Sequence, residues 1–121
     1  MIINPYRYAG GGGSSTLLND LVAWWSMDET SGTRADSHTN GLDLTDNNTV
    51  GYTTGKVSNA ASFLNANLES LSIAHDDLLN PGDSSFTISL WAYQVADYDA
   101  IVSKGSGTEY YRFYYTSTTN A

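Results

Sequence analysis

The 121-residue sequence contains no cysteine, which excludes a disulfide framework, zinc–thiolate sites and thiol catalysis. It also lacks an apolar run of the roughly 18 residues that a membrane helix needs. The segment Met1–Tyr8 has neither the basic start nor the apolar stretch of a secretory signal peptide. We therefore expect a chain with no membrane insertion, stabilised by packing and released from the cytoplasm by a route other than Sec export.

Positive charge is scarce, because 13 acidic residues face only 5 basic ones and the net charge is -8. Such a chain repels phosphate backbones, so nucleic acid is not expected as a partner. The cations are scattered along the sequence, at Arg7, Arg34, Lys56, Lys104 and Arg112. The many carboxylate and amide oxygens are instead suited to a hard cation such as calcium.

A run of glycine and serine, residues 10–15, divides the chain into two parts. Residues 1–20 are predicted to be an N-terminal docking arm with its linker, and residues 21–121 a single domain. The arm is apolar and aromatic but too short to fold alone, with Ile2, Ile3, Pro5, Tyr6 and Tyr8 as its docking residues. The alternative, that the arm packs on its own domain, stays open.

Residues 21–121 read as all-β. Leu21–Met27 and Phe86–Tyr93 follow a period-two pattern in which every second residue is apolar, and each is predicted to be a strand with one inward face. Trp24, Trp25 and Trp91 lie in these strands and are expected in the core. Further strands are predicted at residues 42–44, 60–63, 68–73, 101–103 and 110–115, between turn-rich clusters. This spacing indicates a β-sandwich.

Four collinear segments resemble the LamG-like, or concanavalin A-like, jelly-roll family. They are residues 21–32, residues 35–41, residues 55–63 with 68–73, and residues 85–91 with 101–105. The resemblance implies a two-sheet antiparallel β-sandwich that serves as a binding fold. The family's later strands have no counterpart, so we expect the sandwich to be incomplete in this chain, with the remainder supplied by a continuation, by further copies or by a partner.

The loop from Asp36 to Asp43 is the candidate calcium site. Asp36, Asn40 and Asp43 offer the oxygen ligands that calcium prefers, and the resemblance implies a structural calcium near this loop. The sequence departs from the family at His38–Thr39 and at Leu64, where an acidic residue is usual. An Asx-rich turn that caps its own backbone is the alternative.

No enzyme is expected. Asp28–Glu29 and Asp76–Asp77 are adjacent carboxylates, whereas glycoside hydrolysis needs two carboxyl groups that face one sugar from opposite sides. The Glu-x-Asp-x-x-Glu pattern of concanavalin A-like glucanases is absent. His38 and His75 have neither a nucleophile motif nor metal-ligand spacing and are interpreted as loop histidines.

The aromatic run of residues 110–115, together with Tyr93 and Tyr98, suits stacking on sugar rings. The alternative is a strand that packs on one face and forms hydrogen bonds on the other.

The resemblance is to proteins that act outside cells, yet no export signal is present. A virion protein would act outside cells without an export signal, because it is released when the host lyses. The start of the N-terminal arm resembles the N-terminal peptides of tailed-bacteriophage structural and tail-fibre proteins. The hypothesis is a phage structural or adhesion protein, in a fibre or a decoration role. Its arm would bind other virion proteins, and its domain a cell-surface glycan or neighbouring subunits of a homo-oligomer. The alternative is a fragment of a bacterial extracellular carbohydrate-binding module.

Overall fold

The computed structural model describes residues 18–93, 100–106 and 108–114. Within them the chain forms six β-strands and two short 3-10 helices, which confirms the prediction of an all-β chain. The elements are β1 (Thr45–Asn47), β2 (Gly51–Thr54), β3 (Asn59–Ser62), η2 (Asn65–Asn67), β4 (Ser70–Ser72), η3 (Asp77–Leu79), β5 (Ala100–Ser106) and β6 (Thr108–Tyr114). No helix in this described part is long and apolar enough to cross a membrane.

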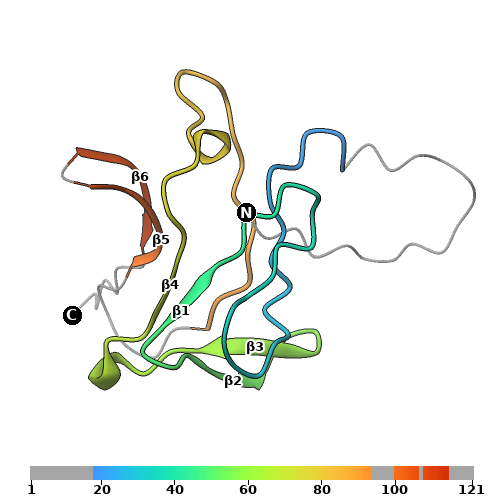
Figure 1. The fold of residues 1–121 in the computed structure, drawn as a ribbon, viewed down its shortest axis with the longest axis vertical. Coiled ribbons are helices and arrows are strands. Elements are labelled where there is room, and N and C mark those ends of the chain that lie inside the picture. Colours follow the sequence, from blue (N-terminus) through green and yellow to red (C-terminus); the bar gives the residue numbers. More distant parts are fainter. Residues whose placement is uncertain (1–17, 94–99, 107, 115–121) are drawn as a thin grey trace, which may run out of the picture. The chain divides into compact units, whose positions relative to one another are not determined.

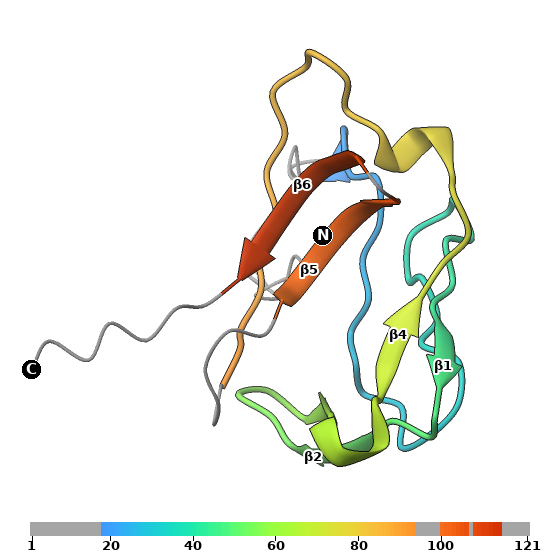
Figure 2. The same ribbon diagram turned by 90° about the vertical axis from the view of Figure 1, so that its left-hand side faces the viewer.

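The strands pair into three two-stranded antiparallel sheets, β1–β4, β2–β3 and β5–β6. In the first, Asp46 of β1 lies opposite Leu71 of β4, and the two strands run side by side in Figures 1 and 2. The chain divides into two compact units, Met1–Leu90 and Trp91–Ala121. The first unit contains β1–β4 and β2–β3, and the second contains β5–β6.

The core of the first unit begins with the alternating segment predicted from the sequence. Leu21, Ala23 and Trp25 are buried, with 6%, 0% and 7% of their surface exposed, while the residues between them are only half-buried. The alternation ends at Met27, whose φ of 61° turns the backbone into the left-handed region. The inward face is therefore confirmed up to Trp25, although this segment makes only one bridge, from Trp25 to Asp36.

Leu42 and Leu44 complete the buried cluster with Ala23 and Trp25. The indole N–H of Trp25 donates to the carbonyl of Leu42 at 2.7 Å, so the polar edge of the largest core side chain is satisfied. Leu21 and Val50 are the other buried apolar residues of the described chain. A core of six apolar residues is small, and the hydrogen bonds of the loops around it carry correspondingly more of the stability.

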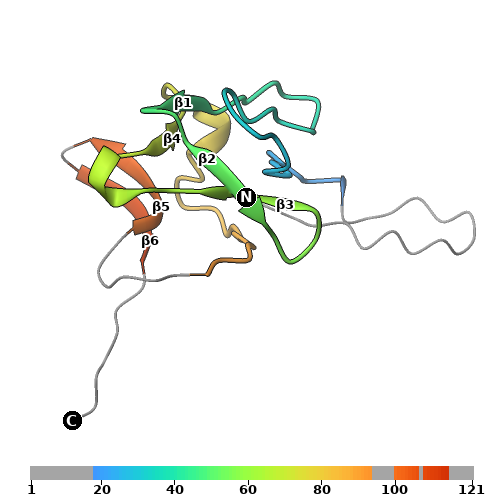
Figure 3. The same cartoon turned by 90° about the horizontal axis from the view of Figure 1, so that it is seen from below.

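The β2–β3 hairpin, seen from below in Figure 3, closes around Gly55. A Cβ atom at Gly55 would lie 2.6 Å from the carbonyl oxygen of Asn59, so only glycine fits this turn. Asn59 also ties the hairpin to the opening segment, because its backbone N–H and its side-chain amide both donate to Asp28, at 3.1 and 2.9 Å. Strand β2 was not among the strands predicted from the sequence.

The predicted strand at Phe86–Tyr93 is wrong, because the structure assigns no strand between η3 and Tyr93. This stretch is a long loop in Figure 1. No described strand pairs with it, so the period-two pattern has no sheet to orient its two faces. Phe86 and Trp91 are accordingly 50% and 72% exposed, and Trp91 is not the core residue that the sequence predicted.

In the second unit, β5 and β6 form a hairpin whose register shifts between Ala100 and Val102 and between Lys104 and Gly105. Ser103, Arg112 and Tyr114 are exposed, whereas Val102, Lys104 and Tyr111 are half-buried. The guanidinium of Arg112 lies over the ring of Tyr114, 5.6 Å from its centre. Burial raises the pKa of Tyr111 above its ordinary value. The predicted strands in this region are confirmed.

Candidate functional site

The loop that follows the opening segment is held at both of its ends by backbone hydrogen bonds. The N–H of Ser37 donates to the backbone carbonyl of Trp24 at 2.7 Å. Arg34 and Leu44 exchange both of their backbone hydrogen bonds at 2.9 Å. The loop therefore starts beside the buried Trp25 and returns to the core at Leu42.

The carboxylate of Asp36 lies at the centre of this loop. Its Oδ1 accepts from the N–H groups of Trp24 and His38, both at 2.9 Å, and its Oδ2 accepts from the N–H of Leu42 at 3.1 Å. One side chain thus joins the opening segment to the start and the end of its own loop. Hydrogen bonds to a charged acceptor are about twice as strong as neutral ones, so Asp36 is a main structural contact of the loop.

The other two candidate ligands lie in the same loop and also form hydrogen bonds. Asp43 accepts the N–H of Asp36 on its Oδ1 at 2.8 Å, and the side-chain amide of Asn40 donates to the carbonyl of Val22 at 2.8 Å. The structure therefore joins Asp36 to Asp43, whereas the side chain of Asn40 bonds Val22 of the opening segment.

The oxygens of this loop fit the capping alternative better than a calcium site. Two N–H donors occupy the lone pairs of Asp36 Oδ1, which leaves Oδ2 of Asp36 with one lone pair for a cation. Among residues 18–93, 100–106 and 108–114, no three His, Cys, Asp or Glu side chains gather in a way that could hold a metal ion. Calcium at Asp36, Asn40 and Asp43 stays a prediction from the resemblance.

A chelator distinguishes the two interpretations. Because Asp36 already caps three N–H groups, we expect EGTA to leave the melting temperature of the full chain unchanged, as measured by circular dichroism. The matched variant is Asp43→Asn, which keeps an oxygen acceptor for the N–H of Asp36 but removes a charge that calcium would need. A lower melting temperature in EGTA for the wild type, with no such shift in Asp43→Asn, would establish the calcium site.

The environment of Asp36 shifts its ionisation. Burial by itself raises the pKa of this carboxyl, but the N–H groups of Trp24, His38 and Leu42 and the charge of His38 outweigh burial and hold the pKa below the ordinary value of 3.8. The charged form is the one that the loop stabilises, as expected for an acceptor of three N–H donors.

Arg34 holds the fold together through hydrogen bonds, and the sequence analysis did not single it out. It is 0% exposed. Its guanidinium donates to the carbonyl of Gly32 and to those of Val50 and Gly51, the latter two at 3.0 and 3.2 Å. No composition or spacing signal marks an arginine whose side chain bonds backbone carbonyl groups, because every residue has a carbonyl and two of the three partners, Val50 and Gly51, come from a distant segment.

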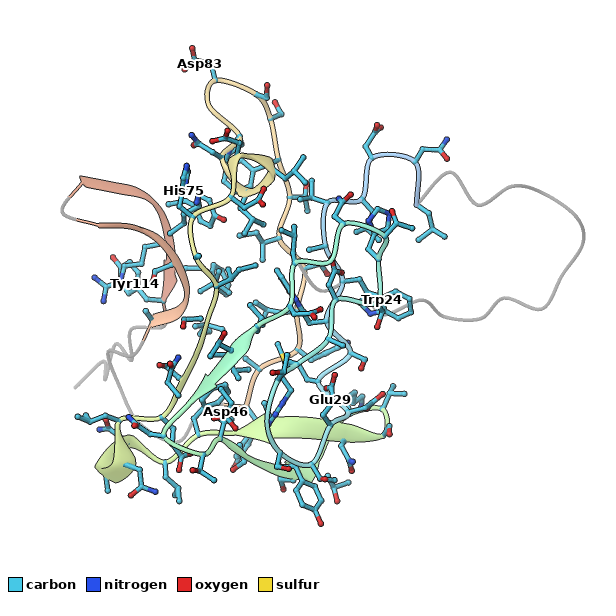
Figure 4. The ribbon with its side chains drawn as sticks, in the orientation of Figure 1. Trp24, Glu29, Asp46, His75, Asp83 and Tyr114 are labelled. Atoms are coloured by element: carbon cyan, nitrogen blue, oxygen red, sulfur yellow. The ribbon has the colours of Figure 1, made fainter. Side chains whose placement is uncertain are left out.

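The carboxylate of Asp46, in β1, joins the segments of Gly32 and Val50, which the guanidinium of Arg34 also joins. Its Oδ2 accepts from the N–H of Gly32 at 3.0 Å and its Oδ1 from the N–H of Val50 at 2.8 Å. Arg34 and Asp46 thus bind opposite polar groups of the same two residues, Gly32 and Val50. Figure 4 shows Asp46 together with Glu29 at the end of the unit that carries the β2–β3 hairpin.

The two pairs of adjacent carboxylates, Asp28–Glu29 and Asp76–Asp77, also contact other groups of the unit. Asp28 bonds Asn59, and Glu29 accepts the N–H of Ala35 at 2.8 Å. Asp76 caps η3 by accepting the N–H of Leu78 at 2.9 Å, and Asp77 lies 3.2 Å from the ring nitrogen of His75.

Backbone capping is the general use of acidic side chains in this unit. Residues 18–90 contain ten carboxylates, and seven accept a hydrogen bond from a backbone N–H. The seven are Asp28, Glu29, Asp36, Asp43, Asp46, Glu69 and Asp76.

The predicted docking residues Ile2, Ile3, Pro5, Tyr6 and Tyr8 lie outside the described residues, as do Tyr98 and Tyr115. Tyr93 and Tyr114 of the predicted sugar-stacking set are 94% and 55% exposed. Comparison of the chain with protein-family models, with curated proteins and with solved structures found no match.

Proposed function

We propose that the chain is a bacteriophage virion protein with a structural or adhesive role. Residues 1–20 anchor it to other virion proteins, and residues 21–121 display a LamG-like β-sandwich that binds a cell-surface glycan or neighbouring subunits of a homo-oligomer. The three small antiparallel sheets are compatible with parts of such a sandwich. The arm is assigned from its aromatic composition and from the glycine linker that follows it.

The use of the acidic side chains supports the structural, non-enzymatic part of the proposal. Seven of the ten carboxylates in residues 18–90 cap backbone N–H groups. Protonation of a carboxylate that caps a backbone N–H weakens that hydrogen bond, which disfavours a general-acid role for these seven groups. This pattern favours a scaffold that displays a surface over an enzyme.

Deletion of the arm tests the anchor. We expect removal of Met1–Ala9 to abolish incorporation into purified particles while leaving the melting temperature of the domain unchanged. The reason is that the docking side chains are lost, whereas the caps described above all lie beyond residue 20. The measurement is quantitative immunoblotting of density-purified particles, with circular dichroism for the melting temperature.

The matched control removes two of the glycines between Gly10 and Gly13, which shortens the linker but keeps every docking residue. This variant should be incorporated like the wild type. Unchanged incorporation of the arm deletion would refute the anchor, and a large fall in its melting temperature would show that the arm packs on its own domain.

A further inference from the structure

The Asp36 loop contains the sequence's only Asn-Gly pair, Asn40–Gly41. An asparagine followed by glycine is the most reactive site for spontaneous loss of the side-chain amide, because the missing Cβ leaves the next backbone nitrogen open to form a five-membered ring. Asparagine is a thermolabile residue for this reason. Whether a folded protein permits the reaction depends on exposure and on how firmly the side chain and backbone are held.

The structure leaves Asn40–Gly41 open. Both residues are exposed, and a Cβ placed on Gly41 would meet nothing within 4 Å, so water and hydroxide can reach the reacting atoms. Gly41 has a φ of +67°, in the left-handed region that glycine adopts without the steric cost of a Cβ atom. One hydrogen bond restrains the side chain, from Nδ2 of Asn40 to the carbonyl of Val22 at 2.8 Å.

We propose that Asn40 is a site of spontaneous deamidation in the folded protein, and that the reaction detaches this part of the loop from Val22. Hydroxide removes the proton of the Gly41 amide, and the nitrogen attacks Cγ of Asn40. This attack closes the five-membered ring; Nδ2 then takes a proton from water, the bond from Cγ to Nδ2 breaks, and ammonia leaves behind a succinimide. Water then opens the ring on one side to aspartate or on the other to isoaspartate, with no change in oxidation state.

The product changes the loop in two ways. The donor that bonded Val22 is lost, and a carboxylate oxygen takes its place beside a carbonyl that can only accept. The net charge of the chain falls from -8 by one further unit. The contacts of Asp36 with Trp24 and Leu42 are retained, so the loop loosens near Val22 without the whole unit unfolding.

Peptide mapping by fragmentation mass spectrometry tests the reaction. The purified full chain is incubated at mildly alkaline pH, in the folded state and in guanidinium. We expect the folded chain to gain about one dalton at Asn40, with separate aspartate and isoaspartate products. Asn59, which precedes alanine and is bonded to Asp28 through its N–H and its side chain, should stay unmodified. Asn40→Gln, which cannot close the five-membered ring, should show no gain at this position.

An Asn40 that stays intact in the folded chain while the unfolded chain converts would overturn the proposal, because the fold would then protect the site. The structural consequence has its own readout, since Asn40→Asp should melt at a lower temperature than the wild type. An unchanged melting temperature for Asn40→Asp would show that the bond to Val22 does not hold the loop.

Discussion

Replacement of Arg34 by alanine should destabilise the protein by about 4 kcal/mol, the largest effect that we expect from a single substitution. The fully buried guanidinium donates to three carbonyl groups, those of Gly32, Val50 and Gly51. Alanine leaves these acceptors without donors and opens a cavity where the side chain was. For a domain whose total stability is of the order of 5–15 kcal/mol, a loss of this size removes a large part of the free energy of unfolding.

The site requires the several N–H donors of the guanidinium, because they reach carbonyl groups on two segments. Arg34→Lys keeps the charge but offers a single ammonium group, which cannot reach carbonyls on two separate segments with the same geometry, so we expect it to cost about 2 kcal/mol. Lys56→Ala is the matched control, since Lys56 is exposed and should change stability by less than about 0.5 kcal/mol. The measurement is the urea midpoint by circular dichroism. Equal midpoints for Arg34→Ala and Lys56→Ala would refute the role of Arg34.

Replacement of Asp36 by alanine should destabilise the protein by about 3 kcal/mol, since three N–H groups lose a charged acceptor. The effect is smaller than for Arg34, because Asp36 is only half-buried and water can reach part of the site. Asp36→Asn keeps one oxygen, which can still accept from Trp24 and His38, but turns an amide towards the N–H of Leu42. We expect it to cost about half as much as alanine.

The same residue makes stability fall in acid. The pKa of Asp36 in the folded protein lies below its ordinary value of 3.8, so its contribution is present above that value and is lost as pH falls through the folded pKa. We expect the urea midpoint of the wild type to drop as the pH falls below the ordinary carboxyl pKa of 3.8. In Asp36→Asn the drop should be smaller, because the amide does not titrate in this range. An identical drop in both proteins would show that Asp36 does not contribute to the acid lability.

The sequence predicted the β class and the inward face of the opening segment because both depend on local alternation. Leu21, Ala23 and Trp25 alternate in the sequence and are buried in the structure. The strand at Phe86–Tyr93 has an equally clear alternation, but no described strand pairs with it, and pairing depends on the rest of the chain rather than on the segment. Strand β2 shows the reverse case, since its residues are mostly polar and exposed and it forms by pairing with β3.

The sequence predicted where the candidate site lies, but not which groups its side-chain oxygens contact. The acidic and amide residues of the Asp36 loop marked it, and in the structure Asp43 bonds Asp36 while Asn40 bonds Val22. What their oxygens contact depends on which N–H groups the fold brings to them, and the N–H of Trp24 comes from 12 residues away in the sequence. Arg34 and Asp46 were missed because their partners are backbone atoms of residues 32 and 50, and a backbone partner leaves no side-chain pattern in the sequence.

The most direct test of the proposed function is the fractionation of the native protein between purified particles and soluble lysate, with its intact mass measured in each fraction. The proposal predicts that the protein is found in the particles. Its absence from particles, with the protein in the soluble fraction alone, would contradict a virion role and favour a cellular carbohydrate-binding module.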